Sequence, residues 1–251
     1  MTTAIEFQNI QTGYGKKEIL HNVSVQAERG KITGIVGPNG SGKSTLVKTL
    51  FGIVPCKSGA IFLDGKNLQS FSRKDVARKL GYVGQDTSVV FDFSVEDIIG
   101  MALYHQKKTD LPSKERIRLA MEELNILEFS GRSIQTLSGG ERKLVFLARA
   151  VAQGADTIIL DEPTNHLDIY HQIFLLNYLK RSGKTILLVI HDLRLAAHYC
   201  DHLFLMQDGR VASSGIPEHV LTPKNAKQVF GISGKISYLP DGTRDFCMDF
   251  Q

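Results

Sequence analysis

One short stretch, residues 37–45, restricts the possible folds of this chain more than any other segment. It reads GPNGSGKST and fits the pattern G-x-x-x-x-G-K-[ST]. A strand-like run at 32–36 precedes it, and a helix-like run at 44–51 follows, with Gly52 positioned to end that helix. Glycines let backbone N–H groups approach an anion closely, and the helix N-terminus adds a partial positive charge. The stretch therefore predicts a strand–loop–helix unit that binds phosphate groups.

Two side chains of this loop carry specific chemistry. The Lys43 ammonium would reach the β- and γ-phosphates of a nucleoside triphosphate, and the Ser44 hydroxyl would bind Mg²⁺. The alternative is a chance match in a glycine-rich turn. The strand and helix signals on either side of the loop argue against that alternative.

Composition describes an ordinary globular protein and excludes several classes. The 251 residues can bury a sizeable core, and the net charge is +4. No block of basic residues is longer than a pair, as at 16–17 and 107–108, so no stripe for nucleic acid is expected. The cysteines Cys56, Cys200 and Cys247 are scattered and show no C-x-x-C spacing. This usage is typical of a reduced, cytosolic protein.

The sequence predicts no membrane segment. Residues 1–6 do not resemble a signal peptide, and no apolar run approaches the length of a membrane span. If the protein serves a membrane, we expect another chain to cross it.

The N-terminal part predicts largely antiparallel β-structure. Apolar and polar residues alternate over 4–11 and 18–28, with a turn at 13–17 between them. A further strand at 60–63 runs into a hairpin turn at 64–65. Next along the chain, we expect a short helix at 73–79 and a buried strand at 80–84 that ends at Gln85.

Helical signals dominate from about residue 94. Ser94 is followed three residues later by Asp97, which predicts a capped helix running towards Leu103. Another helix is expected to begin at 111–114 and to continue through Leu124. The region 94–150 thus reads as a helical insertion in an α/β core.

Signals for a parallel sheet return after this insertion. Continuous apolar runs at 157–160 and 185–190 are typical of strands covered on both faces, and a helix at 169–181 lies between them. A hairpin is expected at 202–211. The residues from 231 onward form a short, polar stretch.

Two acids, Asp161 and Glu162, directly follow the first of these apolar runs. Ligands of open α/β sheets lie beyond the carboxyl ends of the strands, so we expect both carboxylates beside the phosphate loop. Asp161 is then predicted to join the Mg²⁺ shell, and Glu162 to act as general base on the attacking water. A solvated acidic pair at a strand end is the alternative.

A second candidate anion site precedes the helix-like run 142–152. Ser138 is a plausible N-cap, and Gly139 and Gly140 leave backbone N–H groups accessible. An ordinary capped helix start is the alternative. The complete motif is Leu137, Ser138, Gly139, Gly140 and Glu141.

The order of these motifs resembles the ATP-binding subunit of ABC transporters, over roughly residues 4–230. The resemblance implies that Tyr14 stacks on adenine and that Gln85 is the Q-loop glutamine, which joins Mg²⁺ and faces the membrane partner. It also implies a D-loop at 163–168, which includes His166 and Asp168, and a switch histidine, His191, that contacts the γ-phosphate.

The fold class that follows is α/β: a P-loop NTPase core with a mixed sheet, an N-terminal antiparallel β subdomain and an inserted helical subdomain. A single nucleotide-binding domain is expected over 1–251. Its parts are a core at about 4–93 and 151–230, a helical subdomain at about 94–150 and a short tail at 231–251.

The resemblance implies an Mg²⁺-dependent ATPase with four groups of site residues. Glu162 and His191 would be catalytic, and Ser44, Gln85 and Asp161 would bind Mg²⁺. The signature motif 137–141 and Asp168 would act in a dimer. ATP would be bound by Tyr14, Gly37, Pro38, Asn39, Gly40, Ser41, Gly42, Lys43, Ser44 and Thr45.

In that family two copies pair head to tail, and the Ser–Gly–Gly turn of one covers the γ-phosphate held by the other. One chain carries each half-site once, so a two-fold homodimer would complete two sites. The resemblance further implies separate permease subunits that contact residues 86–104 and an indirect link to a periplasmic or extracellular substrate-binding protein. The chain would lie peripherally on the cytoplasmic face of the cell membrane and bind no nucleic acid.

Three stretches, at 160–169, 191–193 and 215–222, resemble the subgroup that imports iron chelates (siderophores), haem and vitamin B12 (cobalamin). The chain departs from the common pattern in two places. Lys143 stands where many members carry Gln, past the anion-binding turn, so hydrolysis is expected to be intact. At 100–105 it lacks the Met-Gly-Arg and Pro-His of many subgroup members, which leaves the transported substrate open.

Other functions remain as alternatives. The chain could serve another ABC importer or an exporter, or act as a soluble ABC ATPase on ribosomes or DNA. Translation-type members usually carry two nucleotide domains, and DNA-repair members usually carry a long coiled coil; this sequence shows neither. A P-loop domain without turnover is disfavoured because Glu162 and His191 are both present.

Overall fold

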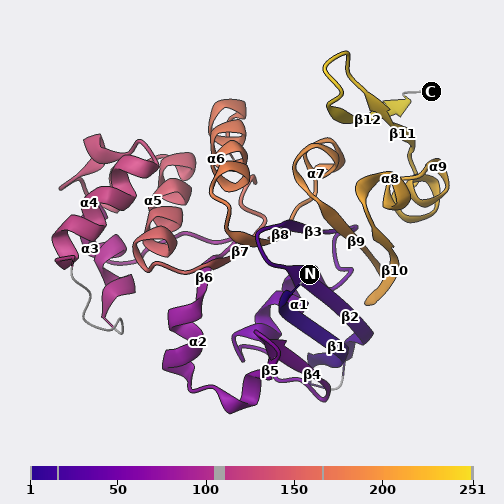
Figure 1. Ribbon diagram of the computed structural model, residues 1–251, viewed down its shortest axis with the longest axis horizontal. Coiled ribbons are helices and arrows are strands. Elements are labelled where there is room, and N and C mark those ends of the chain that lie inside the picture. The colour runs from indigo at the N-terminus through magenta and orange to yellow at the C-terminus, as the bar shows by residue number, and fades with distance from the viewer. Residues whose placement is uncertain (1, 16, 105–110, 166, 250–251) are drawn as a thin grey trace. The chain divides into compact units, whose positions relative to one another are not determined.

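The computed structural model describes residues 2–15, 17–104, 111–165 and 167–249. The chain forms two compact units, Met1–Ser70 with Thr185–Gln251 (unit 1) and Phe71–Lys184 (unit 2) (Figure 1). Lys16, the 107–108 pair, His105 and His166 lie outside the described residues.

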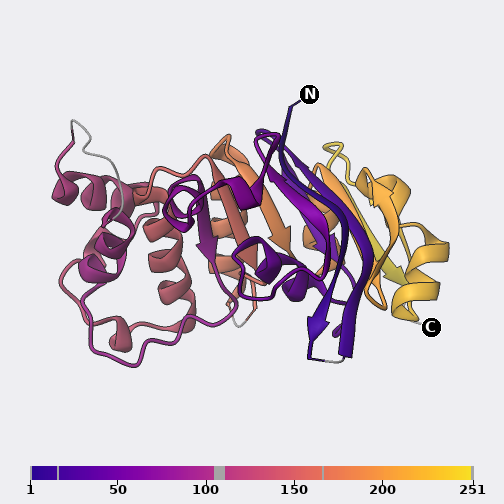
Figure 2. The same ribbon diagram turned by 90° about the horizontal axis from the view of Figure 1, so that it is seen from below.

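Unit 1 contains the expected antiparallel sheet. Its central strand β1 buries Ile5 and Phe7, as the alternation predicted, and also Ile10, which follows a register shift between Phe7 and Ile10. Figure 2 shows β1 and β2 running side by side as long, curved strands. The strand order is β2-β1-β4-β5. The strands are β1 (Thr3–Tyr14), β2 (Lys17–Glu28), β4 (Ser58–Leu63) and β5 (Lys66–Asn67).

A second, mixed sheet in unit 1 contains the strand that leads into the phosphate loop. That strand, β3 (Ile32–Val36), is buried along its whole length. It pairs in parallel with β8 (Thr185–Val189) and β9 (His202–Gln207), and β10 (Arg210–Gly215) pairs antiparallel with β9. Helix α1 (Lys43–Leu50) follows the loop, and Gly52 lies just beyond its end in a left-handed conformation, as expected.

The C-terminal residues of unit 1 form a structure that the sequence pattern did not predict. They contain a hairpin of β11 (Ser233–Tyr238) and β12 (Arg244–Asp249), and β12 packs on α7 (Leu193–Tyr199). Phe246 is completely buried there. Before the hairpin come α8 (Pro217–Val220), α9 (Pro223–Asn225) and a π-helical turn (Ala226–Phe230).

Polar contacts attach this hairpin to the rest of unit 1. Arg194 at the start of α7 pairs with Asp245 at 3.2 Å. Arg244 donates to the carbonyl of Cys200, just after α7, at 3.1 Å and pairs with Glu218 at 3.4 Å. The tail is therefore a packed part of the unit, held at both ends of α7.

Unit 2 combines a parallel strand pair with helices. Strand β6 (Leu80–Val83) pairs in parallel with β7 (Thr157–Asp161). Helix α5 (Gly139–Ala152) packs against β6 and against the two preceding helices (Figure 1). The helices are α2 (Arg73–Lys79), α3 (Val95–Gly100), α4 (Ser113–Glu123), α5 and α6 (Ile169–Arg181). Short 3₁₀ turns lie at Leu68–Ser70 in unit 1 and at Met101–Leu103, Leu127–Phe129 and Ile134–Thr136 in unit 2.

Local capping explains where the helices of unit 2 begin. Ser94 and Asp97 form the predicted capping box at α3. The α-helix ends at Gly100, earlier than expected, and the 3₁₀ turn Met101–Leu103 follows it directly. The region is mainly helical, as the sequence indicated.

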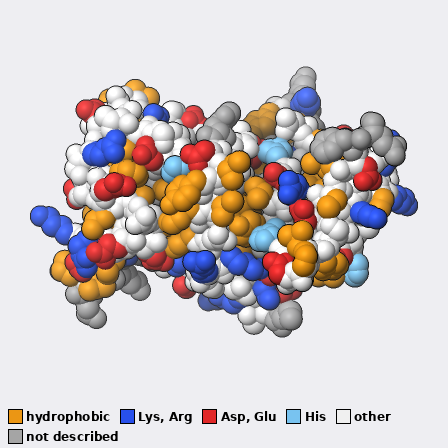
Figure 3. Space-filling view, turned by 90° about the horizontal axis from the view of Figure 1, so that it is seen from above, with side chains coloured by type: hydrophobic (Ala, Val, Ile, Leu, Met, Phe, Trp, Pro, Cys, Tyr) orange, Lys and Arg blue, Asp and Glu red, His pale blue; other side chains and the backbone are white. Residues whose placement is uncertain are grey.

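One face of α6 carries hydrophobic side chains in contact with solvent. Ile169, Tyr170 and Ile173 are all exposed. Figure 3 shows hydrophobic side chains gathered over this helix. None of the helices within the described residues is both long and apolar enough to cross a membrane.

Candidate functional site

The loop at 37–45 has the backbone of an anion cradle. Gly37, Gly40 and Gly42 all adopt positive φ. A Cβ at Gly37 would lie 2.2 Å from the Met206 carbonyl oxygen, and one at Gly42 would lie 2.5 Å from Leu20 Cδ2. Only glycine allows the chain to pass this closely.

Side chains of the loop are placed to meet phosphate. Lys43 is buried, and its Nζ donates to the carbonyls of Gly37 and Pro38, each at 2.9 Å. The Ser41 hydroxyl is buried and has no hydrogen-bond partner among the described residues. A buried hydroxyl without a partner costs about 1–3 kcal/mol, which a ligand oxygen would recover. This hydroxyl and the glycine-rich backbone of the loop fit a bound phosphate.

Unit 1 places His191 at the same sheet edge as the phosphate loop. Strands β3 and β8 are parallel and pair Ile35 with Val189. Gly37 and His191 each follow two residues later, so both emerge at the carboxyl edge. Asp192 caps α7 by accepting the backbone N–H groups of Arg194 and Leu195, which fixes the turn that carries His191.

Tyr14 also belongs to unit 1. It is the last residue of β1, pairs with Lys17 across the hairpin, and is 53% exposed. An aromatic ring so exposed is available for stacking.

Unit 2 repeats this edge geometry with the other predicted residues. Strands β6 and β7 pair Val83 with Leu160, so Gln85 and Glu162 each lie two residues beyond a paired position. Asp161 ends β7 and is only 1% exposed. Burial, and secondarily the charge of Asp161, raise the pKa of Tyr82 to about 12, so this phenol stays neutral near pH 7.

Glu162 is held in an unusual conformation. Its φ is +51°, in the left-handed region, and its side chain is buried. Such a conformation costs a non-glycine residue about 1–3 kcal/mol and is common at functional sites. Asn165 Nδ2 donates to Glu162 Oε2 at 2.7 Å. This bond fixes the orientation of the carboxylate.

The sequence analysis placed Asn165 in the predicted D-loop but did not predict its contact with Glu162. The available signal was an amide three residues after an acid, in a turn-forming Pro-Thr-Asn segment.

Lys143 has a structural role that sequence reasoning also missed. Its side chain is buried, and Nζ donates to the carbonyls of Gly84 at 2.9 Å and Gln85 at 2.6 Å. Burial lowers the pKa of Lys143, while the nearby Asp161, Asp86 and Glu162 oppose that shift. The residue that departs from the common pattern therefore ties α5 to the start of the segment after β6.

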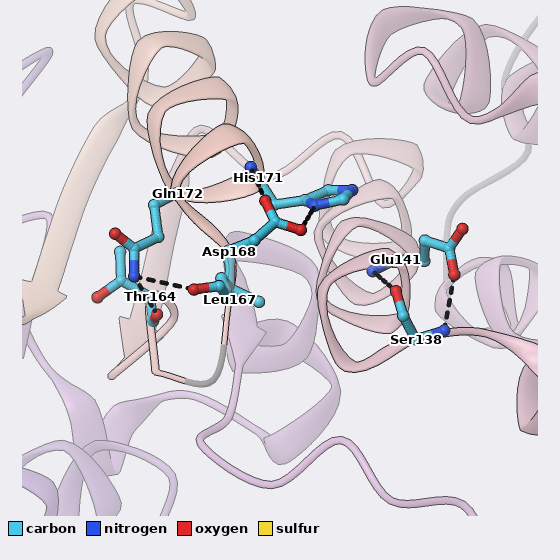
Figure 4. A network of polar contacts seen from close by, with 7 residues as sticks. All are labelled: Ser138, Glu141, Thr164, Leu167, Asp168, His171 and Gln172. Atoms are coloured by element: carbon cyan, nitrogen blue, oxygen red, sulfur yellow. Dashed lines mark hydrogen bonds and ion pairs between the residues drawn. The ribbon is translucent and has the colours of Figure 1, made fainter.

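The signature turn is fixed by a capping box at the start of α5. Ser138 Oγ accepts the backbone N–H of Glu141 at 3.3 Å, and the Ser138 N–H donates to Glu141 Oε2 at 2.6 Å (Figure 4). That N–H is the main reason why the pKa of Glu141 is lowered. Leu137 is buried beneath the turn, whereas Ser138 and Gly139 are exposed.

Asp168 begins α6 and is held by two contacts with one residue. Its Oδ1 accepts the backbone N–H of His171 at 2.9 Å, and its Oδ2 lies 2.7 Å from His171 Nδ1 (Figure 4). Gln172 closes the same turn by donating to the carbonyls of Thr164 and Leu167, each at 3.1 Å. The predicted D-loop is thus an ordered turn at its described residues.

Comparison with known proteins identifies relatives along almost the whole chain. A family model described as ABC transporter matches residues 20–165. The iron(3+)-hydroxamate import ATP-binding protein FhuC of Bacillus subtilis is 34% identical, covering 98% of this chain and 95% of its own. The hemin import ATP-binding protein HmuV of Pseudomonas fluorescens is 36% identical, covering 93% and 94%.

Among solved structures, cbiO1 from Clostridium perfringens, described as part of the ABC transporter complex cbiONQ, superposes with a TM-score of 0.78. It is 29% identical, covering 90% of this chain and 93% of its own.

We predict that Lys143→Met lowers the free energy of unfolding by about 1–3 kcal/mol, because two carbonyls lose their donor. Removing the ammonium also removes its desolvation cost, which the neighbouring carboxylates offset only in part, so we expect a loss towards the lower end of this range. Lys143→Gln keeps a donor and should lose less. Denaturant unfolding of both variants measures the difference. Equal stability of Lys143→Met and the parent would contradict the anchoring role.

Proposed function

The chain belongs to the ABC transporter family of ATP-binding subunits, and from that premise we propose that it hydrolyses ATP to drive an importer of an iron chelate, haem or cobalamin. The observation that carries the proposal is the glycine cradle at 37–45 with its buried Ser41 hydroxyl, which has no hydrogen-bond partner in the described part of the chain. The substrate class rests on the names of relatives matched along the chain.

The phosphate loop would hold the triphosphate of ATP. Backbone N–H groups and the Ser41 hydroxyl would bind phosphate oxygens, and Lys43 would turn its ammonium from the loop carbonyls towards the β- and γ-phosphates. Tyr14 would stack its exposed ring on adenine.

The donor chemistry of three residues fits Mg²⁺. Ser44 supplies a hydroxyl, Gln85 a side-chain amide oxygen and Asp161 a carboxylate, and Mg²⁺ prefers oxygen ligands of this kind. When bound, the ion would neutralise charge on the phosphate oxygens.

Glu162 would act as general base. Its carboxylate accepts a proton from the attacking water, while the Asn165 amide keeps Oε2 in place. A positioned base contributes roughly 10²–10⁴-fold in rate. His191, on its capped turn, would donate a hydrogen bond to the γ-phosphate.

A second copy of the chain would complete each site. The exposed Ser138–Gly139 turn of one copy would cover the γ-phosphate held by the other, with Asp168 taking part in the same pairing. ATP would then hold the two copies together, and hydrolysis would release them.

The transport partners would be separate permease subunits. Residues 86–104 would meet them at the cytoplasmic face of the membrane, where the chain would lie peripherally. A substrate-binding protein would act through the permease.

We predict that Glu162→Gln binds ATP but releases phosphate at least 100-fold more slowly, because the base is lost. The same variant should form a stable dimer with ATP, as measured by size-exclusion chromatography with light scattering.

Lys43→Ala should lose ATP binding, whereas the control variant Glu128→Gln, at an exposed 3₁₀ turn, should match the parent. Undiminished phosphate release by Glu162→Gln would remove this residue from its assigned role.

We also predict that the tagged chain recovers a protein with many membrane spans from detergent-solubilised membranes of its own source. Recovery of ribosomal proteins or DNA-associated proteins instead would contradict the importer assignment. Mass spectrometry of the captured proteins measures the outcome.

A further inference from the structure

One side chain of unit 2 contacts two segments that the proposed function assigns to the dimer. His171 lies on the first turn of α6, between Asp168 and the start of α5 (Figure 4). Its Nδ1 lies 2.7 Å from Asp168 Oδ2, and its backbone N–H donates to Asp168 Oδ1 at 2.9 Å. Both oxygens of the carboxylate are therefore held by the same residue.

The imidazole ring of His171 also lies against the signature turn. A Cβ built on Gly140 would lie 3.1 Å from ring Cγ and 3.2 Å from Nδ1, which is tighter than most real contacts. Glycine at this position therefore lets the ring pack directly on the α5 backbone. The charge of His171 also reaches the Glu141 carboxylate, as a minor cause of its lowered pKa beside the Ser138 N–H.

Exposure distinguishes the two partners of this contact. The Asp168 side chain is 64% exposed, whereas His171 is 21% exposed. An exposed carboxylate normally samples several rotamers, and binding a partner must then fix one of them at an entropic cost. Asp168 faces solvent with its orientation already fixed by a less exposed neighbour.

We propose that His171 is a positioning residue that holds Asp168 in one orientation and sets its place relative to the signature turn of the same chain. A second copy would then meet the two segments as one preorganised surface. The inference rests on the proposed ATP-driven pairing of two copies and adds a residue to it. The occupant of this surface is the second copy.

Two substitutions separate this role from ordinary helix capping. His171→Phe keeps a ring against Gly140 but loses the Nδ1 contact with Asp168. His171→Asn keeps a donor near the position of Nδ1 but loses the ring. The backbone N–H that caps α6 remains in both variants, so a residue that acted only through the cap would tolerate both.

The test uses the full chain carrying Glu162→Gln, so that ATP is bound without turnover. Sedimentation velocity measures the dimer dissociation constant in saturating ATP, and a fluorescent ATP analogue measures nucleotide affinity at protein concentrations that keep the chain monomeric. We expect His171→Phe to weaken the dimer by about tenfold, as the loss of one charge-assisted hydrogen bond predicts. His171→Asn should recover most of that loss, while monomer nucleotide affinity and thermal unfolding stay unchanged in both.

Equal dimer affinity of His171→Phe and its parent would overturn the proposal. So would a loss in both variants that is matched by a lower thermal midpoint, because His171 would then be only structural. If His171→Phe does not fold, His171→Leu, which also lacks the Nδ1 donor, takes its place: a dimer about tenfold weaker than that of His171→Asn supports the donor role, and equal affinity of these two variants overturns it. Failure of the Glu162→Gln parent to dimerise with ATP would instead overturn the proposed function itself.

Discussion

The chemistry of this chain depends on one geometric constraint, that parallel strands end at the same edge of their sheet. In unit 1, the pairing of Ile35 with Val189 places Gly37 and His191 at one edge. In unit 2, the pairing of Val83 with Leu160 does the same for Gln85 and Glu162. Strands β3, β7 and β8 are buried along their whole length, and a one-residue slip would turn each side chain to the opposite face. The register that packs the core therefore also places the predicted site residues of each unit at one edge of its strands.

Much of the fold and of the candidate site could be predicted because the signals are local. The helices at Arg73–Lys79 and Ile169–Arg181 have the expected bounds, and the box at Ser94 forms as its spacing indicates. The loop at 37–45 depends on glycines that are read directly from the sequence. Each of these features is decided within a few residues.

The missed features depend on contacts between distant segments or on single conformations. Lys143 binds a carbonyl 59 positions earlier in the chain, and Arg244 binds one 44 positions earlier. The left-handed turn at Glu162 has no marker in the sequence, because glycine is the usual residue there. Lys143 and His171 together tie α5 to the end of β6 and to the start of α6, two contacts that the helix-like run at 142–152 did not reveal.

The central claim is that one copy supplies the phosphate loop and the other supplies the signature turn. The most direct measurement mixes two inactive variants, Lys43→Ala and Ser138→Arg, and follows phosphate release. In a mixed dimer, the intact loop of one variant faces the intact turn of the other, so the mixture should hydrolyse ATP although neither variant does so alone. A mixture as inactive as its components, or full activity of Ser138→Arg alone, would contradict the account.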